Sequence, residues 1–169
     1  MHPIVIKHFS EISAAEYHRI VQAREAVFFL EQHITEPDAD EVDPQSVFLW
    51  MEEDGRVEEQ LYFEYVALNL SSPPRVTQVR DTAEALSAMS HKNFDLIGRV
   101  LVDAGYRRRG LCRRLMHEAL RHIALTWGPQ PVRISAQEYL AGFYASLGFE
   151  AVSGTYLEAG IPHVRMLRR

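Results

Sequence analysis

The chain has 169 residues, of which 47% are hydrophobic and 24% charged, and its formal net charge is −5. This length and composition suit one globular domain and exclude a wholly disordered chain. The single cysteine excludes an internal disulfide and a cysteine-only zinc site. No apolar run is long enough for a membrane span and no leader pattern is visible, so we expect a cytoplasmic protein that binds no membrane. The negative net charge argues against a nucleic-acid binder.

In chain order, the first half of the sequence predicts several strands and one long helix. Apolar and β-branched runs indicate strands at 4–9, 47–51 and 60–70. Ser13 and Glu16 form a capping-box pattern, and the apolar residues behind them recur at three- and four-residue steps, which predicts a helix to about Leu30. The acid-rich segment 35–45 is expected to be a loop with at most one helical turn, and Asp54-Gly55 indicates a hairpin.

The second half predicts a strand at 96–102, a tight connection at 105–109 and a helix from Leu111 to about Trp127. A strand at 132–136, a short helix at 137–147 closed by Gly148, and strands at 151–157 and 163–167 complete the chain. A short helix is predicted at 81–89. The order of elements favours the α/β (α+β) class, as a single domain over 1–169 with a mixed, partly parallel central sheet and helices on both faces.

The clearest chemical signal lies where the strand at 96–102 leads into the next helix. Arg107, Arg108 and Arg109 precede Gly110, and the helix begins at Leu111. Backbone N–H groups at a helix start have no partner within the helix, the helix dipole favours negative charge there, and a glycine lets a ligand approach closely. The segment therefore predicts a phosphate or pyrophosphate site, and the alternative is a solvated basic helix start.

The sequence matches two other motifs incompletely. Gly105 and Gly110 have P-loop spacing, but Leu111 and Cys112 stand where that loop needs a lysine and a hydroxyl. His117-Glu118 is followed by His122, one residue too late for the zinc motif H-E-x-x-H. The sequence therefore predicts neither a nucleotide-binding P-loop nor a metal site.

Two further motifs, in this order and separation, resemble the GCN5-related N-acetyltransferase (GNAT) superfamily. Arg107-Arg108-Arg109-Gly110-Leu111-Cys112, behind the strand Val100-Leu101-Val102, resembles its [QR]-x-x-G-x-[GA] motif, with Cys112 where Gly or Ala is usual. Residues 134–137, followed by Phe143-Tyr144-Ala145-Ser146-Leu147-Gly148-Phe149, resemble its second motif, a strand and then a helix ending in F-Y-x-x-x-G-F. The stretches 27–32 and 156–164, with the Asp40/Asp43 loop, resemble the ElaA-type subfamily. Residues 71–93 are longer than the family's connection at that point, so they are predicted as an insertion.

The resemblance implies the GNAT fold and transfer of an acetyl group from acetyl-CoA, as co-substrate, to an amine in a ternary complex. The pantetheine arm is expected to hydrogen-bond along the exposed edge of Val100-Leu101-Val102, and the pyrophosphate to lie on the residues from Arg107 to Cys112. A backbone N–H near Leu101 or Val102 is the expected oxyanion donor. The motif match assigns Tyr144 as the general acid for the departing thiolate, and the alternative is that its ring only packs.

The resemblance also implies that the first helix and the loop after it line the acceptor side. Glu31, Asp40 and Asp43 are the acids expected to bind the acceptor there, together with His163. Glu31, the loop acids, His33 and His163 are candidates for the base. Such acids attract cations, which favours a primary amine on a small cationic molecule or a peptide. The resemblance allows a homodimer, and the alternative function is a non-catalytic CoA-binding sensor on the same fold.

Overall fold

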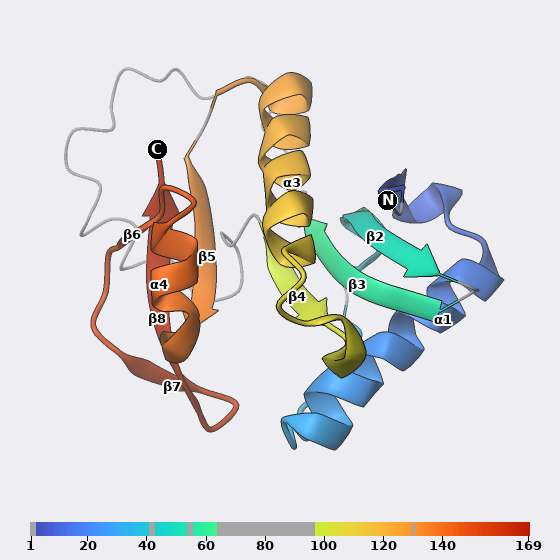
Figure 1. The fold of residues 1–169 in the computed structure, drawn as a ribbon, viewed down its shortest axis with the longest axis horizontal. Helices are drawn as coiled ribbons and strands as arrows, with labels where there is room; N and C mark the ends of the chain where they lie inside the picture. Colours follow the sequence, from blue (N-terminus) through green and yellow to red (C-terminus); the bar gives the residue numbers. More distant parts are fainter. Residues whose placement is uncertain (1–2, 41–42, 54–55, 64–96, 130) are drawn as a thin grey trace.

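The computed structural model describes residues 3–40, 43–53, 56–63, 97–129 and 131–169 (Figure 1). The strands and helices of these ranges are β1 (Val5–His8), α1 (Ala14–Arg24), β2 (Val47–Glu53), β3 (Arg56–Phe63), β4 (Gly98–Val102), α3 (Leu111–Trp127), β5 (Val132–Gln137), α4 (Ala141–Ala145), β6 (Glu150–Ala151), β7 (Tyr156–Glu158) and β8 (Ile161–Arg168). The turn at 54–55, the insertion predicted at 71–93 and its helix at 81–89 lie outside the described residues. Within the described ranges, no helix has the length and apolar character that a membrane crossing needs.

The described strands form two separate sheets. One sheet has the order β1-β2-β3-β4, and the other has the order β5-β8-β6 with β7 paired to β8. Each ladder between described strands is antiparallel. The arrows of β4 and β5 nevertheless point the same way in Figure 1, and α3 returns the chain from the end of β4 to the start of β5. The sequence predicts parallel strands within one sheet. In the structure, the parallel strands β4 and β5 belong to different sheets, and α3 is the crossover helix between them. The mixed α/β class is confirmed.

Helices cover both faces of the first sheet, as the side-chain alternation of β2 shows. Leu49 and Met51 belong to the main core, which also contains Leu115 and Met116 of α3. Phe48 and Trp50 point the other way and pack with Ile20 of α1. A continuous apolar run such as β2 is the pattern of a strand buried on both faces, as predicted from the sequence.

The first helix begins as predicted and ends earlier. Ser13 caps it: the Ser13 hydroxyl accepts from the Glu16 backbone N–H, and the Glu16 carboxylate accepts from the Ser13 N–H at 2.8 Å. Regular α-helix stops at Arg24, and the chain continues to Glu31 as a π-helical segment, Glu25–Glu31. π-Helical turns are rare and are frequent at functional sites.

A β-bulge interrupts the pairing of β4 with β3. Leu101 is opposite Gln60 and Gly98 is opposite Tyr62, so that two residues of β4 face one residue of β3. One of the two, Arg99, has a φ of 49°, a backbone conformation that side chains rarely adopt. Bulges redirect side chains and occur often near active sites. The bulge consists of Arg99 and Val100, so it overlaps the start of the predicted cofactor strand Val100-Leu101-Val102.

Candidate active site

The start of α3 has the form that the sequence predicts for a phosphate site. Gly110 is the N-cap residue, with a φ of 76° and no side-chain hydrogen bond capping the helix. A Cβ placed on Gly110 would meet no atom within 4 Å, so the space in front of the helix is open. The N–H groups of the first turn therefore face a space in which a phosphate fits.

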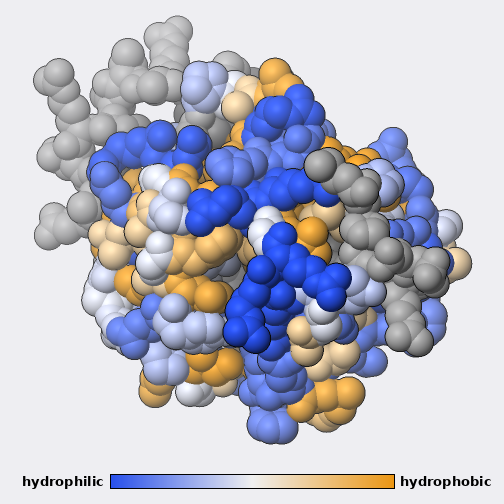
Figure 2. All heavy atoms as spheres, viewed as in Figure 1, coloured by the Kyte–Doolittle hydropathy of each residue, from blue (hydrophilic) through white to orange (hydrophobic). Residues whose placement is uncertain are grey.

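Three arginines precede this helix start, and contacts within the loop orient two of them, Arg107 and Arg109. Arg107 Nε donates to the Val102 carbonyl at 3.0 Å. Arg109 donates to the Gly105 carbonyl at 2.9 Å, and its guanidinium lies 4.9 Å from the centre of the Tyr106 ring. Figure 2 shows hydrophilic side chains gathered over α3 and the loop before it, in the middle of this face. The positive charge predicted for the loop is thus concentrated around the helix start.

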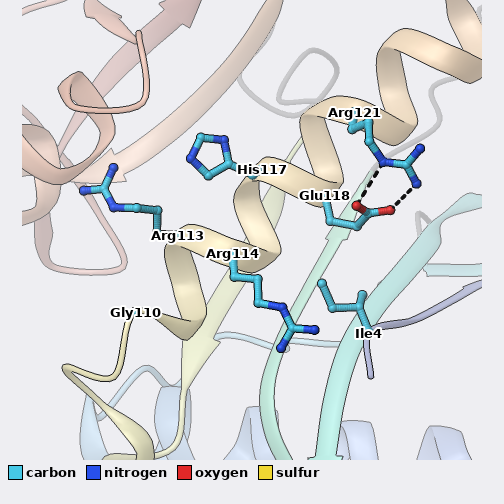
Figure 3. Close-up of a pocket in the computed structure, with 7 residues that line it drawn as sticks. All are labelled: Ile4, Gly110, Arg113, Arg114, His117, Glu118 and Arg121. Carbon is cyan, nitrogen blue, oxygen red and sulfur yellow. Dashed lines mark hydrogen bonds and ion pairs between the residues drawn. The ribbon is translucent and has the colours of Figure 1, made fainter. Parts of the chain in front are cut away.

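An open hollow of about 660 Å³ extends from Gly110 along α3. Arg113 and His117 project to one side of the helix, and Arg114, Glu118 and Arg121 project to the other side, toward Ile4 (Figure 3). Glu118 and Arg121 form an ion pair on this surface. Among the predicted cofactor residues, the hollow touches Gly110 alone, so it continues the helix start outward and does not follow the edge of β4.

Among the described strands, β4 stands at the end of its sheet, and one of its carbonyls accepts a side-chain hydrogen bond. β4 is the last strand of its sheet and pairs with β3 on one side. Leu101 is 3% exposed, while Val100 and Val102 are half-buried. The Val102 carbonyl accepts from Arg107, so a ligand that pairs with this end of β4 must displace the guanidinium.

Tyr144 lies in α4, within the main core. Its side chain is 6% exposed, and its ring contacts those of Phe143 and Phe149 edge-on, at centroid distances of 5.1 and 6.0 Å. Arg113 joins this helix to the start of α3: it donates to the Ser146 hydroxyl at 2.8 Å and lies over the Phe143 ring. The predicted general acid therefore lies in the helix that contacts the predicted phosphate site.

Glu31 is brought to the cofactor loop. Its carboxylate accepts from Arg107 at 2.6 Å, and this hydrogen bond lowers the pKa of Glu31 below its ordinary value. The next residue, Gln32, accepts through its side chain from Gln137 at 2.9 Å. The end of the π-helical segment thus contacts the loop after β4, through Arg107, and the end of β5, through Gln137.

The loop acids do not form the open acidic surface that the sequence suggests. Asp43 is 2% exposed; Arg24 donates to it at 3.0 Å, and the Tyr17 hydroxyl donates to it at 2.8 Å. Asp40 accepts from Arg99 at 3.0 Å, and Asp38 accepts from both Arg24 and Arg99. Arg24 precedes the loop and Arg99 follows it by about sixty residues. The loop acids that the sequence analysis expects to attract a cation thus already have arginine partners within the chain.

His163 lies in β8, opposite Gln137 of β5. It is 8% exposed, and its Nδ1 is 2.8 Å from the Ile161 carbonyl. The Tyr156 ring lies beside it at a centroid distance of 6.1 Å. His163 is thus placed near Gln32 and Glu31 through Gln137, whereas Asp43 lies in the interior between α1 and the loop.

Three residues of this region, Arg99, Gln32 and Gln137, were not singled out from the sequence. Arg99 is the one charged residue of the apolar run 96–102, and a charge in such a run requires partners. Arg24 gives a similar signal, because it falls on the apolar face that Ile20 and Val27 mark. The two glutamines carry no pattern of their own, and only the fold brings them together.

Known proteins resemble the chain over most of its length. A family model for an acetyltransferase (GNAT) domain matches residues 75–169. A UPF0039 protein of Schizosaccharomyces pombe is 32% identical over 96% of this chain and 93% of its own length. Protein ElaA of Escherichia coli is 29% identical over 95% of this chain and 92% of its own length. A crystal structure of an acyl-CoA N-acyltransferase from Pseudomonas aeruginosa superposes with a TM-score of 0.80, at 29% identity and full coverage of both chains.

Proposed function

The chain belongs to the GNAT acetyltransferase family and is similar to ElaA, and from this premise we propose that it transfers an acetyl group from acetyl-CoA to a primary amine. The observation that carries the proposal is the start of α3. There an uncapped helix N-terminus, a glycine with positive φ and a cluster of arginines leave an open, positively charged space directly after an edge strand. A diphosphate attached to an extended arm has the shape and charge for such a site.

The donor would lie along β4. Its pyrophosphate would accept from the first backbone N–H groups of α3, with Arg107, Arg108 and Arg109 around it, and its pantetheine arm would add to the strand edge at Val100-Leu101-Val102. A backbone N–H at Leu101 or Val102 would then be positioned to stabilise the oxyanion of the thioester. Arg107 would exchange the Val102 carbonyl and Glu31 for the phosphate.

The chemistry would be direct attack of a neutral amine on the thioester carbonyl. The C–N bond forms, the tetrahedral oxyanion collapses, and the C–S bond breaks. The CoA thiolate leaves with a proton, for which Tyr144 is the proposed donor. The acceptor would be a small cationic molecule or a peptide amine that enters beside Glu31, the acid that contacts the loop after β4. A screen of polyamines, amino acids, aminoglycosides and peptides, with detection of free CoA thiol, would identify it.

The proposed donor site is tested by a charge change at Gly110. Gly110→Asp should weaken CoA binding at least about 100-fold by calorimetry, because a carboxylate would face the pyrophosphate. Gly110→Asn is the matched control: it has the same size, tolerates the same positive φ and is equally favoured at a helix N-cap. It should retain much more of the affinity. Near-native CoA binding by Gly110→Asp would contradict the phosphate assignment.

The alternative, a CoA-binding sensor without catalysis, makes a different prediction in the turnover assay. A sensor would bind CoA, as measured by calorimetry, and release no thiol with any amine in the screen. The proposed transferase releases thiol in step with amine consumption and forms the acetamide, which mass spectrometry detects.

A further inference from the structure

One contact fixes which ring nitrogen of His163 carries a hydrogen. Its Nδ1 lies 2.8 Å from the backbone carbonyl oxygen of Ile161. A carbonyl oxygen only accepts, so Nδ1 must carry the hydrogen, and in the neutral imidazole the lone pair is then on Nε2. A histidine whose Nδ1–H is anchored to a fixed acceptor has a defined ring orientation and a defined basic nitrogen.

The basic nitrogen is unoccupied. Across the part of the chain that the structure describes, no protein group forms a hydrogen bond with Nε2 of His163. This atom is also not sealed from solvent, because among the described side chains the one fully buried polar atom without a partner is Arg19 Nε. The ring is therefore held in the protein, while its Nε2 lone pair has no partner among the described residues and is not fully sealed from solvent.

The position of His163 separates it from the predicted general acid. His163 and Gln137 are direct partners across β5 and β8, so their side chains lie on one face of that sheet. The next pair, Ala136 and Val164, lies on the other face and belongs to the core that contains Tyr144. His163 therefore lies outside the core that holds Tyr144, on the face of the β5–β8 pair that it shares with Gln137.

The other candidate bases are engaged. The Glu31 carboxylate is bound by Arg107 in this structure, which lowers its pKa. Once the pyrophosphate takes Arg107, the proposed partner of this carboxylate is the acceptor ammonium, and a carboxylate paired with a cation is again a weak base. Asp38, Asp40 and Asp43 each accept from Arg24 or Arg99. Each of these loop carboxylates is therefore already the acceptor of an ion pair, whereas Nε2 of His163 has no partner among the described residues.

We infer that His163 is the general base of this site and that its Nε2 takes the proton from the acceptor ammonium; the inference rests on the proposed acetyl transfer. The ammonium loses one proton to Nε2, and the neutral amine attacks the thioester carbon. Collapse of the oxyanion breaks the C–S bond, the second amine proton is lost as the amide forms, and the thiolate is protonated. The net product besides amide and CoA thiol is one proton, which the imidazolium releases to solvent.

Several groups near His163 are polar or titratable. Tyr156 and Glu158 face it from β7, Gln137 from β5 and Arg165 from its own strand. The Tyr156 hydroxyl is 2.6 Å from the Ser135 hydroxyl and donates to Glu158 at 3.3 Å, and Arg165 lies over the Tyr156 ring. These contacts fix the position of the Tyr156 ring beside His163, and none of them involves Nε2 of His163.

The test uses His163→Asn. The asparagine amide can still donate to the Ile161 carbonyl, so the anchoring contact is preserved while the basic nitrogen is lost. At neutral pH we expect kcat to fall about 100-fold or more, with unchanged CoA affinity by calorimetry. The loss should shrink as pH rises toward the pKa of the acceptor amine, and it should shrink at fixed pH for acceptors with weakly basic amines, because such amines need no base. Added imidazole should restore part of the rate.

The controls separate this role from others. His18→Asn, on the exposed side of α1, should behave as the wild type. His33→Asn tests the rival histidine: if it removes the acid limb of the pH profile and His163→Asn does not, the assignment is overturned. A loss that is equal at all pH values and for all amines would mean a structural role, as would failure of imidazole rescue. Should His163→Asn unfold, His163→Gln is measured in the same way. A wild-type protein without amine-dependent thiol release would instead contradict the proposed transfer itself.

Discussion

At the scale of single residues, Tyr144 illustrates how one side chain serves two needs. Its ring is a core element between Phe143 and Phe149, so replacing it with a small residue would leave a cavity and cost about 3–5 kcal/mol of stability. Its proposed chemical role depends on the hydroxyl alone. A test of that role must therefore keep the ring.

Tyr144→Phe meets this requirement. We expect kcat to fall about 100-fold, because the CoA thiolate would leave without its proton donor, while CoA affinity stays within about twofold. Tyr139→Phe is the control, since Tyr139 is 72% exposed and lies outside the core. Steady-state rates with a good acceptor and calorimetry with CoA give both values. An unchanged kcat would leave Tyr144 with a packing role.

At the scale of elements, local patterns in the sequence predicted most of the fold, and long-range charge pairing was missed. The capping box at Ser13, the apolar face of α3 and the glycine after α4 each act within a few residues, so their elements appear as expected. The strand predicted at 60–70 begins at Arg56, because pairing with β2 extends it through a polar stretch without strand pattern. The helix predicted to Leu30 changes to a π-helix after Arg24. The sequence alone cannot show that Arg24 and Arg99 neutralise the acidic loop, because Arg99 reaches it only in the folded chain.

The ion pair of Arg24 with Asp43 holds this loop against α1. Both side chains are almost fully buried, and removing one partner leaves an uncompensated buried charge. We expect Asp43→Asn to lower the free energy of unfolding by about 3 kcal/mol, measured by urea denaturation. Glu36→Gln, an exposed acid of the same loop, should change it by less than about 0.5 kcal/mol. Equal effects of the two variants would contradict the structural role.

The same variant has a pH signature at Tyr17. Burial, and next the hydrogen bond to Asp43, raise the pKa of Tyr17 to about 12 from an ordinary value of 10.0. A raised pKa in the folded state means that this contribution to stability is complete below pH 10 and is lost as pH rises through about 12. Asp43→Asn should therefore bring the ultraviolet titration of Tyr17 to lower pH, with Tyr17→Phe identifying its signal. An unshifted titration would mean that burial alone sets the pKa.

At the scale of the whole molecule, the pair of Arg107 and Glu31 joins the donor side to the acceptor side. Arg107 belongs to the loop between β4 and α3, and Glu31 ends the π-helical segment that follows α1. If the pyrophosphate takes Arg107, the carboxylate of Glu31 becomes available to an incoming ammonium. Binding of the two substrates would then be coupled, and such coupling must be equal in both directions.

This coupling gives opposite effects on the two substrates when the carboxylate is removed. In Glu31→Gln, CoA no longer competes with Glu31 for Arg107; the pair is about 40% exposed on both sides, with side-chain exposures of 39% and 43%, so it is worth at most about 1 kcal/mol. CoA should therefore bind about two- to fivefold tighter, while the KM of a cationic acceptor rises because its ammonium loses the carboxylate. The pKa of Glu31 lies below its ordinary value, so the difference persists at neutral pH and fades as acid protonates the wild-type carboxylate.

Glu25→Gln, an exposed acid at the start of the same segment, is the control. Calorimetry with CoA and acceptor kinetics measure the two effects, and weaker CoA binding by Glu31→Gln would show that Glu31 positions Arg107 for the phosphate and does not compete with it.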